Sequence, residues 1–249
     1  MQVRFVAGIP VCSARRSFSR IVGRVVVDVM PTPASPLAQP IPLAVNRTTS
    51  HSPVPFDRPL ILASQSPRRR QLLEQYGYQF TTQLPDDAAE CGICSRETPP
   101  ELVARLAYQK AADVARHITF GAIIGCDTVA ECLGSILGKP ADRDHAREML
   151  RLMRGRLHHV YSGLCLWLRP ENEVHVQVDV SRLRMDEVSD DDLERYLDTN
   201  AWEGKSGAFG YQDGLDWIKL IDGSESNVVG LPMELLAKML AKIARRQVG

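Results

Sequence analysis

From residue 60 onward, the apolar positions of this chain fall into runs and stripes that predict strands alternating with helices. Leu60 to Ala63 is a short continuous apolar run, which is typical of a buried strand. Ser66 and Pro67 follow as a helix N-cap and a first helical position, so this strand leads into a helix through a tight turn. The stretch 174–180 alternates strictly between valine and polar residues, which predicts a strand with one buried and one exposed face.

The remaining elements follow from the same two periodicities. We expect further strands at 78–84, 121–128, 157–169 and 173–183, and helices at 101–117, 142–154, 190–197 and 233–246. Gly134 and Ser135 predict a hairpin after the strand at 121–128. Strands that alternate with helices in this way are typical of an α/β fold.

The first turn of the first of these helices holds three consecutive arginines, Arg68, Arg69 and Arg70. Acidic residues are the favoured ones there, because the turn carries partial positive charge and unpaired N–H groups. A docked anion would offset the like charge, and N–H groups, serine hydroxyls and guanidinium groups together suit phosphate oxygens. Helical spacing turns Arg70 away from the apolar stripe, so we expect Arg68 and Arg69 to contact a ligand. A basic surface turn balanced by carboxylates stays open as the alternative.

Two more charged residues stand where the pattern favours a ligand. Lys110 falls near the centre of the apolar stripe of the helix at 101–117, where a lysine is costly unless it reaches solvent or meets an anion. Asp127 ends an apolar strand, and ligand chemistry in α/β sheets is usually sited at the carboxyl ends of strands, although a single Asp there is often only a turn former. The hairpin that follows would return Lys139 toward Asp127, which places a cation next to a base.

The charge and hydropathy of the chain indicate which classes of binding partner to expect. Thirty Lys and Arg residues balance thirty Asp and Glu residues, so the formal net charge is zero and no global field draws the chain to nucleic acid or to an anionic membrane. No apolar run approaches the length needed to cross a bilayer. We therefore expect a cytoplasmic protein without nucleic-acid or membrane partners, in which any anion binding is local.

Cysteine and histidine spacing gives little support for a metal or redox site. Cys91 and Cys94 have the spacing of a redox pair or half a zinc site, but no second Cys or His pair lies at a matching distance. Cys126 falls inside an apolar run and is expected to be buried. His158 and His159 have no partners at ligand spacing, so we expect them to be structural.

Residues 1–57 differ in composition from the rest of the chain. They are rich in arginine, hold Asp28 as the one acidic residue before Asp57, and become rich in Pro and Ser after residue 30. This composition does not bury a core, so we expect a flexible extension followed by one domain at 58–249. A transit peptide and a mis-assigned start codon stay open as alternatives.

Five separated segments, in order, resemble motifs of the Maf family of nucleoside triphosphate pyrophosphatases. Residues 62–73 (Leu-Ala-Ser-Gln-Ser-Pro-Arg-Arg-Arg-Gln-Leu-Leu) resemble the family's opening motif, and 106–111 its Leu-Ala-x-x-Lys-Ala element. Asp127-Thr128 followed by 138–140 (Gly-Lys-Pro) resembles a third element. Residues 205–212 and 223–232 resemble the glycine-rich and C-terminal elements, with departures at Ser206, Phe209 and Tyr211.

The resemblance implies a mixed, elongated sheet with flanking helices and two lobes around a central cleft, often paired as a homodimer. It also implies hydrolysis of a nucleoside triphosphate between its α and β phosphates, with Mg²⁺ or Mn²⁺ as cofactor. The catalytic residues would be Asp127 as general base with Lys139, Lys110 and Arg69. Substrate contacts would come from Ser64, Ser66, Arg68, Thr128, Lys205, Gln212 and Asn227. Glu90 and Asp127 would hold the metal ion, with loop solubility as the alternative role of Glu90.

Arg68, Thr128 and Gln212 resemble the residues at the specificity positions of the family branch that acts on dTTP and UTP. The resemblance therefore implies a pyrimidine-directed housecleaning enzyme. A 7-methyl-GTP pyrophosphatase of the same family and a non-catalytic nucleotide-binding regulator of cell division stay open. Retention of Asp127, Lys110 and Lys139 argues against the regulator, because binding alone needs no base.

Overall fold

The computed structural model describes residues 26–29, 56–86 and 97–247 of the chain. Within these residues the strands are β1 (Val26–Val29), β2 (Leu60–Ala63), β3 (Phe80–Thr82), β4 (Gly121–Cys132), β5 (Ser135–Leu137), β6 (Leu157–Arg169), β7 (Glu173–Met185) and β8 (Ile218–Asp222). The helices are α1 (Pro67–Gln75), α2 (Pro99–Ala115), α3 (Arg143–Met153), α4 (Asp190–Asp198), α5 (Glu225–Val229) and α6 (Met233–Gln247), with short 3-10 turns at η2 (Ser206–Ala208) and η3 (Tyr211–Asp213). The predicted α/β class is confirmed.

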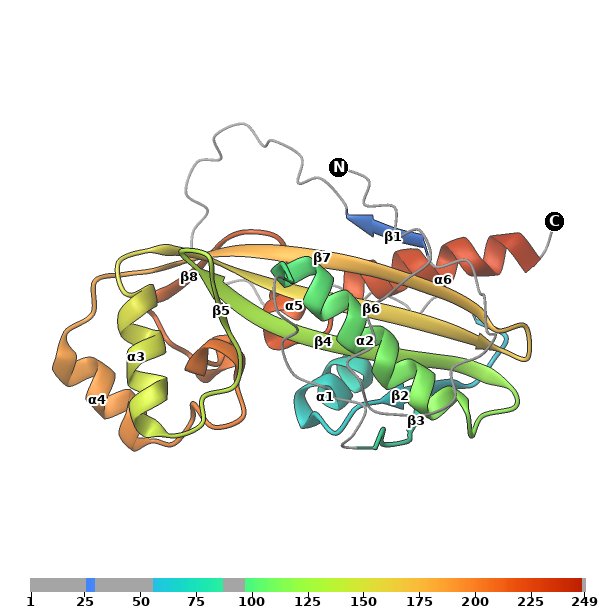
Figure 1. The fold of residues 1–249 in the computed structure, drawn as a ribbon, viewed down its shortest axis with the longest axis horizontal. Helices are drawn as coiled ribbons and strands as arrows, with labels where there is room; N and C mark the ends of the chain where they lie inside the picture. The colour runs from blue at the N-terminus through green and yellow to red at the C-terminus, as the bar shows by residue number, and fades with distance from the viewer. Residues whose placement is uncertain (1–25, 30–55, 87–96, 248–249) are drawn as a thin grey trace.

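All of these strands join one mixed sheet in the order β1-β7-β6-β4-β2-β3, with β5 on β4 and β8 on β7. Strand β2 is parallel to β3 and β4, whereas β6 is antiparallel to both of its neighbours, β4 and β7. The strands β6 and β7 have 13 residues each, which at the usual rise corresponds to about 40 Å. They run the length of the molecule and make the sheet elongated (Figure 1).

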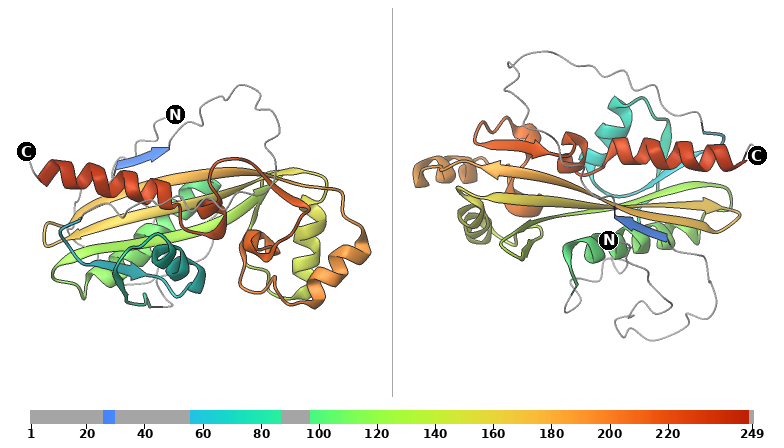
Figure 2. Two further views of the ribbon diagram at one scale, coloured as in Figure 1. Left: turned by 180° about the vertical axis from the view of Figure 1, so that it is seen from behind. Right: turned by 90° about the horizontal axis from the view of Figure 1, so that it is seen from above.

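The helices divide the molecule into two lobes. In the first lobe, α2 covers one face of the sheet, and α1 and α6 cover the other (Figure 2). In the second lobe, α3, α4 and η2 pack with the far ends of the long strands around a separate apolar core. The expected two-lobed architecture is therefore present. No helix among the described residues is both long and apolar enough to cross a membrane.

Two glycines bring α2 unusually close to the sheet. A Cβ atom at Gly125 of β4 would lie 2.2 Å from the carbonyl oxygen of Ala107, and one at Gly163 of β6 would lie 2.1 Å from that of Val103. Only glycine at these positions lets the helix backbone rest directly on the strands. Lys110, which lies about one turn beyond Ala107, thereby reaches Asp127 of β4.

One short strand departs from the expectation of a flexible extension over 1–57. Strand β1 pairs in parallel with β7, with Val26 opposite His175 and Val29 opposite Val178. This stretch is rich in β-branched valine, which favours a strand, and β7 offers a free edge beyond its pairing with β8. Cys91 and Cys94 lie outside the described residues, whereas Cys126 is buried, as expected.

Candidate functional site

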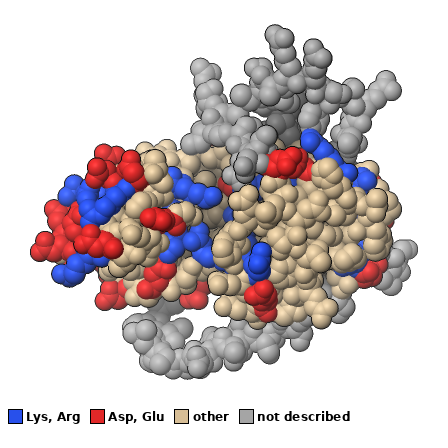
Figure 3. Space-filling view, turned by 90° about the horizontal axis from the view of Figure 1, so that it is seen from below, with Lys and Arg blue, Asp and Glu red and all other residues tan. Residues whose placement is uncertain are grey.

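A cleft of about 710 Å³ lies between the two lobes. Figure 3 shows Lys and Arg side chains gathered around the hollow between the lobes, whereas blue and red alternate on the second lobe. The cleft is lined by most of the residues that the sequence singles out: Ser64, Ser66, Arg68, Arg69, Lys110, Asp127, Thr128, Lys139, Lys205 and Gln212. Segments far apart in the chain therefore meet at one site.

The turn from β2 to α1 forms one wall of this cleft. The Ser64 hydroxyl accepts a hydrogen bond from the Ser66 amide at 3.2 Å, which fixes the turn. Ser66 is the N-cap of α1, but its side chain makes no capping hydrogen bond, and Pro67 opens the helix without an N–H group. The N-terminus of α1 thus lies at the cleft with a serine hydroxyl that the helix does not use.

Arg69 is buried in this wall, with 8% of its surface exposed, and is held entirely by neutral oxygens. Its Nε donates to the Gly230 carbonyl at 2.7 Å, Nη1 donates to the Ser64 hydroxyl at 3.1 Å, and Nη2 donates to the Thr128 hydroxyl at 3.2 Å. Among the described residues no carboxylate forms an ion pair with it. Its positive charge is therefore oriented without being neutralised.

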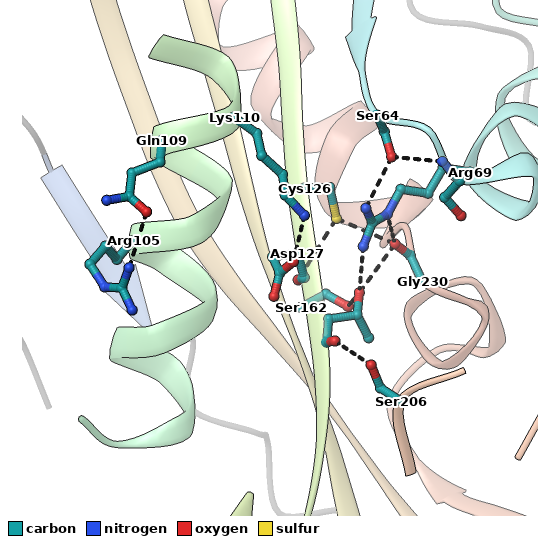
Figure 4. A network of polar contacts seen from close by, with 12 residues as sticks. Ser64, Arg69, Arg105, Gln109, Lys110, Cys126, Asp127, Ser162, Ser206 and Gly230 are labelled. Atoms are coloured by element: carbon teal, nitrogen blue, oxygen red, sulfur yellow. Dashed lines mark hydrogen bonds and ion pairs between the residues drawn. The ribbon is translucent and has the colours of Figure 1, made fainter. Parts of the chain in front are cut away.

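Lys110 and Asp127 form an ion pair at 2.7 Å, with the Asp127 side chain 15% exposed. Because neighbouring residues of a strand point to opposite faces, Asp127 faces α2 while Thr128 faces Arg69. Figure 4 shows Lys110 on one side of β4 and Arg69 on the other. Two cations thus approach the cleft from both faces of the sheet.

Arg68 and Lys139 lie nearer the cleft mouth. Arg68 donates from Nη2 to the Gly204 carbonyl at 2.9 Å, and so links α1 to the second lobe. Burial, and the neighbouring charge of Arg69, lower the pKa of Arg68 from its ordinary value. Lys139 is exposed, on the connection between β5 and α3, and Arg70 is exposed as predicted.

Lys205 reaches the cleft from the second lobe, but its charge is balanced. Its Nζ forms a short ion pair with Asp213, which also accepts a hydrogen bond from the Tyr196 hydroxyl at 3.4 Å. A Cβ atom at Gly210 would lie 2.4 Å from both Lys205 Nζ and Asp213 Oδ2, so a glycine there leaves room for the pair. No pattern in the sequence pointed to Asp213, which lies eight residues beyond its partner.

Two expected site residues are absent from the described lining of the cleft, one because it is buried elsewhere and one because it lies outside the described residues. Asn227 is fully buried in α5, where its Nδ2 donates to the Val160 carbonyl at 3.1 Å and to the Ser181 hydroxyl at 2.9 Å. Asn227 is not among the residues that line the cleft, so the structure gives no support to the expected contact of its side chain with substrate. Glu90 lies outside the described residues, and the described ranges contain no cluster of three metal-ligating side chains.

Some contributors to the site were not predicted as site residues. The carbonyl of Gly230 accepts from Arg69, and the Ser206 hydroxyl donates to the Thr128 carbonyl at 2.8 Å. Ser162, fully buried on β6, lies 2.8 Å from the Thr128 hydroxyl. Backbone acceptors depend on how distant segments pack, so residue identity does not predict them.

An oriented arginine with no carboxylate partner among the described residues, a helix N-terminus and an acid–lysine pair surround one cleft of an α/β protein. These are the groups that suit a polyanion beside a group able to take a proton. The family model described as Maf-like protein matches residues 59–243, and the chain belongs to the Maf family. The resemblance drawn from the motifs is thereby confirmed.

Named relatives support the same placement. The chain is 59% identical to the dTTP/UTP pyrophosphatase of Rhodopirellula baltica over 187 residues, which cover 75% of this chain and 82% of the relative. It is 38% identical to the protein of that name from Dictyoglomus thermophilum and 39% identical to that from Pelotomaculum thermopropionicum, with 74% of this chain and 95% of each relative covered. A solved nucleoside-triphosphatase from Mycobacterium abscessus is similar at a TM-score of only 0.37 and 14% identity.

Proposed function

We propose that this protein hydrolyses dTTP and UTP to the nucleoside monophosphate and pyrophosphate. The observation that carries the proposal is the Arg69 guanidinium, buried, aimed by three neutral acceptors and balanced by no carboxylate among the described residues. A buried charge of this kind is expensive unless an anion meets it. The names of relatives up to 59% identical supply the choice of pyrimidine nucleotides.

The triphosphate would lie across the wall built by the β2–α1 turn. Arg69 and Arg68 offer guanidinium donors, Ser64 and Ser66 offer hydroxyls, and Lys139 offers an exposed ammonium group at the mouth. Charge increases on the leaving pyrophosphate as the bond between the α and β phosphates breaks. Cations fixed in place before the reaction stabilise that charge more than they stabilise the bound substrate. Gln212 and Lys205 line the side of the cleft toward the second lobe, where they would contact the nucleoside.

Asp127 is the proposed general base. Lys110 donates to one of its oxygens at 2.7 Å and so orients the carboxylate, and the side chain stays partly exposed to the cleft. The carboxylate would take a proton from the water that attacks the α phosphorus in line with the leaving pyrophosphate. The products are the monophosphate and pyrophosphate.

A divalent cation fits the donors at this site. Asp127 offers a hard carboxylate oxygen, and Mg²⁺ is typically bound by one or two carboxylates together with substrate phosphates, so a dedicated protein cluster is not required. We propose that Asp127 and Glu90 hold Mg²⁺ or Mn²⁺, which would neutralise phosphate charge when bound. The domain boundary at residue 57, the cytoplasmic location and the homodimer stay predictions.

The test is pyrophosphate release from dTTP, UTP, CTP, GTP and 7-methyl-GTP, with Mg²⁺ or Mn²⁺, by the wild type and by Asp127→Asn. We expect turnover of dTTP and UTP, and a loss of about 10³-fold in kcat in the variant, since general-base catalysis contributes on this scale. Equal turnover of 7-methyl-GTP and UTP would contradict the pyrimidine assignment. Wild-type protein that binds nucleotide but releases no pyrophosphate would contradict the reaction.

A further inference from the structure

Two elements outside α1 orient the guanidinium group of Arg69. Its Nη2 depends on Thr128 of β4, and its Nε depends on the carbonyl of Gly230, the residue that ends α5. Whatever fixes that hydroxyl and that carbonyl therefore also fixes the guanidinium. The residues behind them are not part of the cleft lining, so they are candidates for an indirect role.

A buried polar layer on β6 and β7 holds both acceptors. The Ser162 hydroxyl lies 2.8 Å from the Thr128 hydroxyl and donates to the Asn227 carbonyl of α5 at 3.3 Å. The Asn227 side chain then ties α5 to β6 through the Val160 carbonyl and to β7 through the Ser181 hydroxyl. Ser162, Ser181 and Asn227 are each fully buried. This layer connects the sheet to α5, and α5 to Arg69.

The hydrogen bonds in this layer run in a defined donor-to-acceptor order. Because Ser162 donates to the Asn227 carbonyl, its oxygen is free to accept the Thr128 proton. Thr128 then presents its lone pairs to Arg69 Nη2. The Thr128 hydroxyl also lies within hydrogen-bond distance, 3.3 Å, of the Gly230 carbonyl, which is the acceptor that Arg69 Nε uses. Without the Ser162 hydroxyl, the Thr128 proton would go to that carbonyl instead. Loss of a group that touches no ligand would therefore disturb both ends of the guanidinium.

We propose that Ser162 and Asn227 are positioning residues that act on the triphosphate through Arg69. The inference rests on the proposed function in one respect, namely that the anion at Arg69 is the phosphate chain of the nucleotide. It also explains why Asn227 stands in a motif associated with the site while its side chain lies outside the cleft. Its role is to hold α5, and with it the Gly230 carbonyl, at a fixed position on the sheet.

A double-mutant cycle tests the inference. Ser162→Ala is measured in the wild-type background and in the Arg69→Lys background. Arg69→Lys keeps the positive charge but loses the guanidinium group that donates to both the Thr128 hydroxyl and the Gly230 carbonyl. Kinetic constants for dTTP are determined for all four proteins. We expect kcat/KM to fall about tenfold in the wild-type background, and less than about twofold in the Arg69→Lys background, since residues acting as a unit are not additive. Equal losses in both backgrounds would overturn the inference.

Two further variants separate positioning from stability. Cys165→Ala removes a fully buried group of similar size from the same strand on its opposite face, so it should lower the melting temperature without changing kcat/KM. Ser162→Thr keeps the hydroxyl and should restore most of the activity lost in Ser162→Ala. A loss of activity in Cys165→Ala as large as that in Ser162→Ala would assign the effect to core packing and overturn the inference.

The cycle is also measured by calorimetry as the affinity for inorganic pyrophosphate, which needs no turnover. If the wild type binds pyrophosphate but hydrolyses no nucleotide, the proposed function fails while the cycle on affinity still decides the inference. A tenfold weakening that disappears in the Arg69→Lys background supports positioning through Arg69. An affinity that Ser162→Ala leaves unchanged in the wild-type background contradicts it.

Discussion

The two faces of β4 handle buried positive charge differently at neighbouring positions. On the face toward α2, Lys110 is 5% exposed and meets the Asp127 carboxylate at 2.7 Å. On the opposite face, Arg69 is 8% exposed, and within the described part of the chain it donates to hydroxyl and carbonyl oxygens and to no carboxylate. The depth of burial is similar, and the partners differ in charge.

This difference in partners gives the two cations different roles, although they contact neighbouring residues of β4. A carboxylate oriented by a lysine can accept a proton from a water molecule, whereas an oriented guanidinium without a counter-charge attracts a phosphate. Lys205 in the second lobe resembles Lys110 in this respect, because Asp213 balances it. A chain with zero formal net charge can therefore bind a polyanion, because the uncompensated charge is concentrated on one wall of one cleft.

The largest effect expected from this comparison is that of Arg69→Met. Removing the guanidinium should lower kcat/KM for dTTP by about 10²- to 10³-fold, because a fixed cation on the phosphate chain is lost. The free energy of unfolding should change by less than about 1 kcal/mol, since the lost hydrogen bonds are offset by relief of a buried, unpaired charge.

Steady-state kinetics and urea unfolding measure these two quantities. Arg70→Met, in the same helical turn but exposed, is the matched control and should leave both quantities near wild type. A variant of Arg69 that unfolds easily while keeping its activity would show that the arginine is structural, and the contrast between the two faces would lose its meaning.

A smaller effect is expected on the other face, where α2 rests on glycine. In Gly163→Ala the new Cβ would lie 2.1 Å from the Val103 carbonyl oxygen, so helix and strand must separate. We expect a loss of about 3 kcal/mol in stability and a fall of roughly 6–12 °C in melting temperature. Lys110 should move away from Asp127, so kcat should fall as well.

Gly138→Ala is the matched control for this change. No atom lies within 4 Å of the Cβ position at Gly138, and its φ is not positive, so stability should stay within about 0.5 kcal/mol of the wild type. Full stability in Gly163→Ala would show that the contact between α2 and the sheet yields easily, and would contradict a position of Lys110 set by the backbone.

Local patterns were sufficient to predict most of the fold. The strand at 60–63, the helix beginning at Pro67 and the helix capped by Ser189 all appear as expected. Strand β8 and helix α5 were not predicted, because each has only five residues and its pattern is too short to show a period. Sheet order also depends on pairings between distant segments, such as β2 with β4, which no local pattern encodes.

The candidate site could be predicted as a set of residues but not as a geometry. Lys110 was recognisable because a lysine on an apolar stripe needs a partner, and the structure supplies Asp127. The motif that holds Asn227 did not predict that its side chain is buried against the sheet, because a motif does not distinguish a side chain that touches ligand from one that holds a neighbouring element. The three neutral acceptors around Arg69 could not be predicted, because they are one carbonyl and two hydroxyls from three separate segments of the chain.

The smallest effect concerns a second buried basic group on the same sheet face as Arg69. His158 is fully buried on β6 and packs edge-on against the ring of Phe209, with 5.4 Å between ring centroids. Burial lowers the pKa of His158 to about 4 from an ordinary value of 6.5. Between these values the unfolded chain binds a proton that the folded protein does not, so stability is full above pH 6.5 and falls as the pH decreases toward 4.

Removing the histidine should flatten that dependence. This group alone accounts for a loss of about 2 kcal/mol between about pH 7.5 and pH 5, and His158→Leu should lack that part of the slope. Urea unfolding at the two pH values measures the difference, with His117→Leu, an exposed histidine, as the control that keeps the wild-type slope. Identical slopes in the wild type and His158→Leu would mean that His158 takes up its proton inside the folded protein. The face that carries Arg69 would then tolerate a second unpaired cation, and the contrast with the Lys110–Asp127 face would extend into the second lobe.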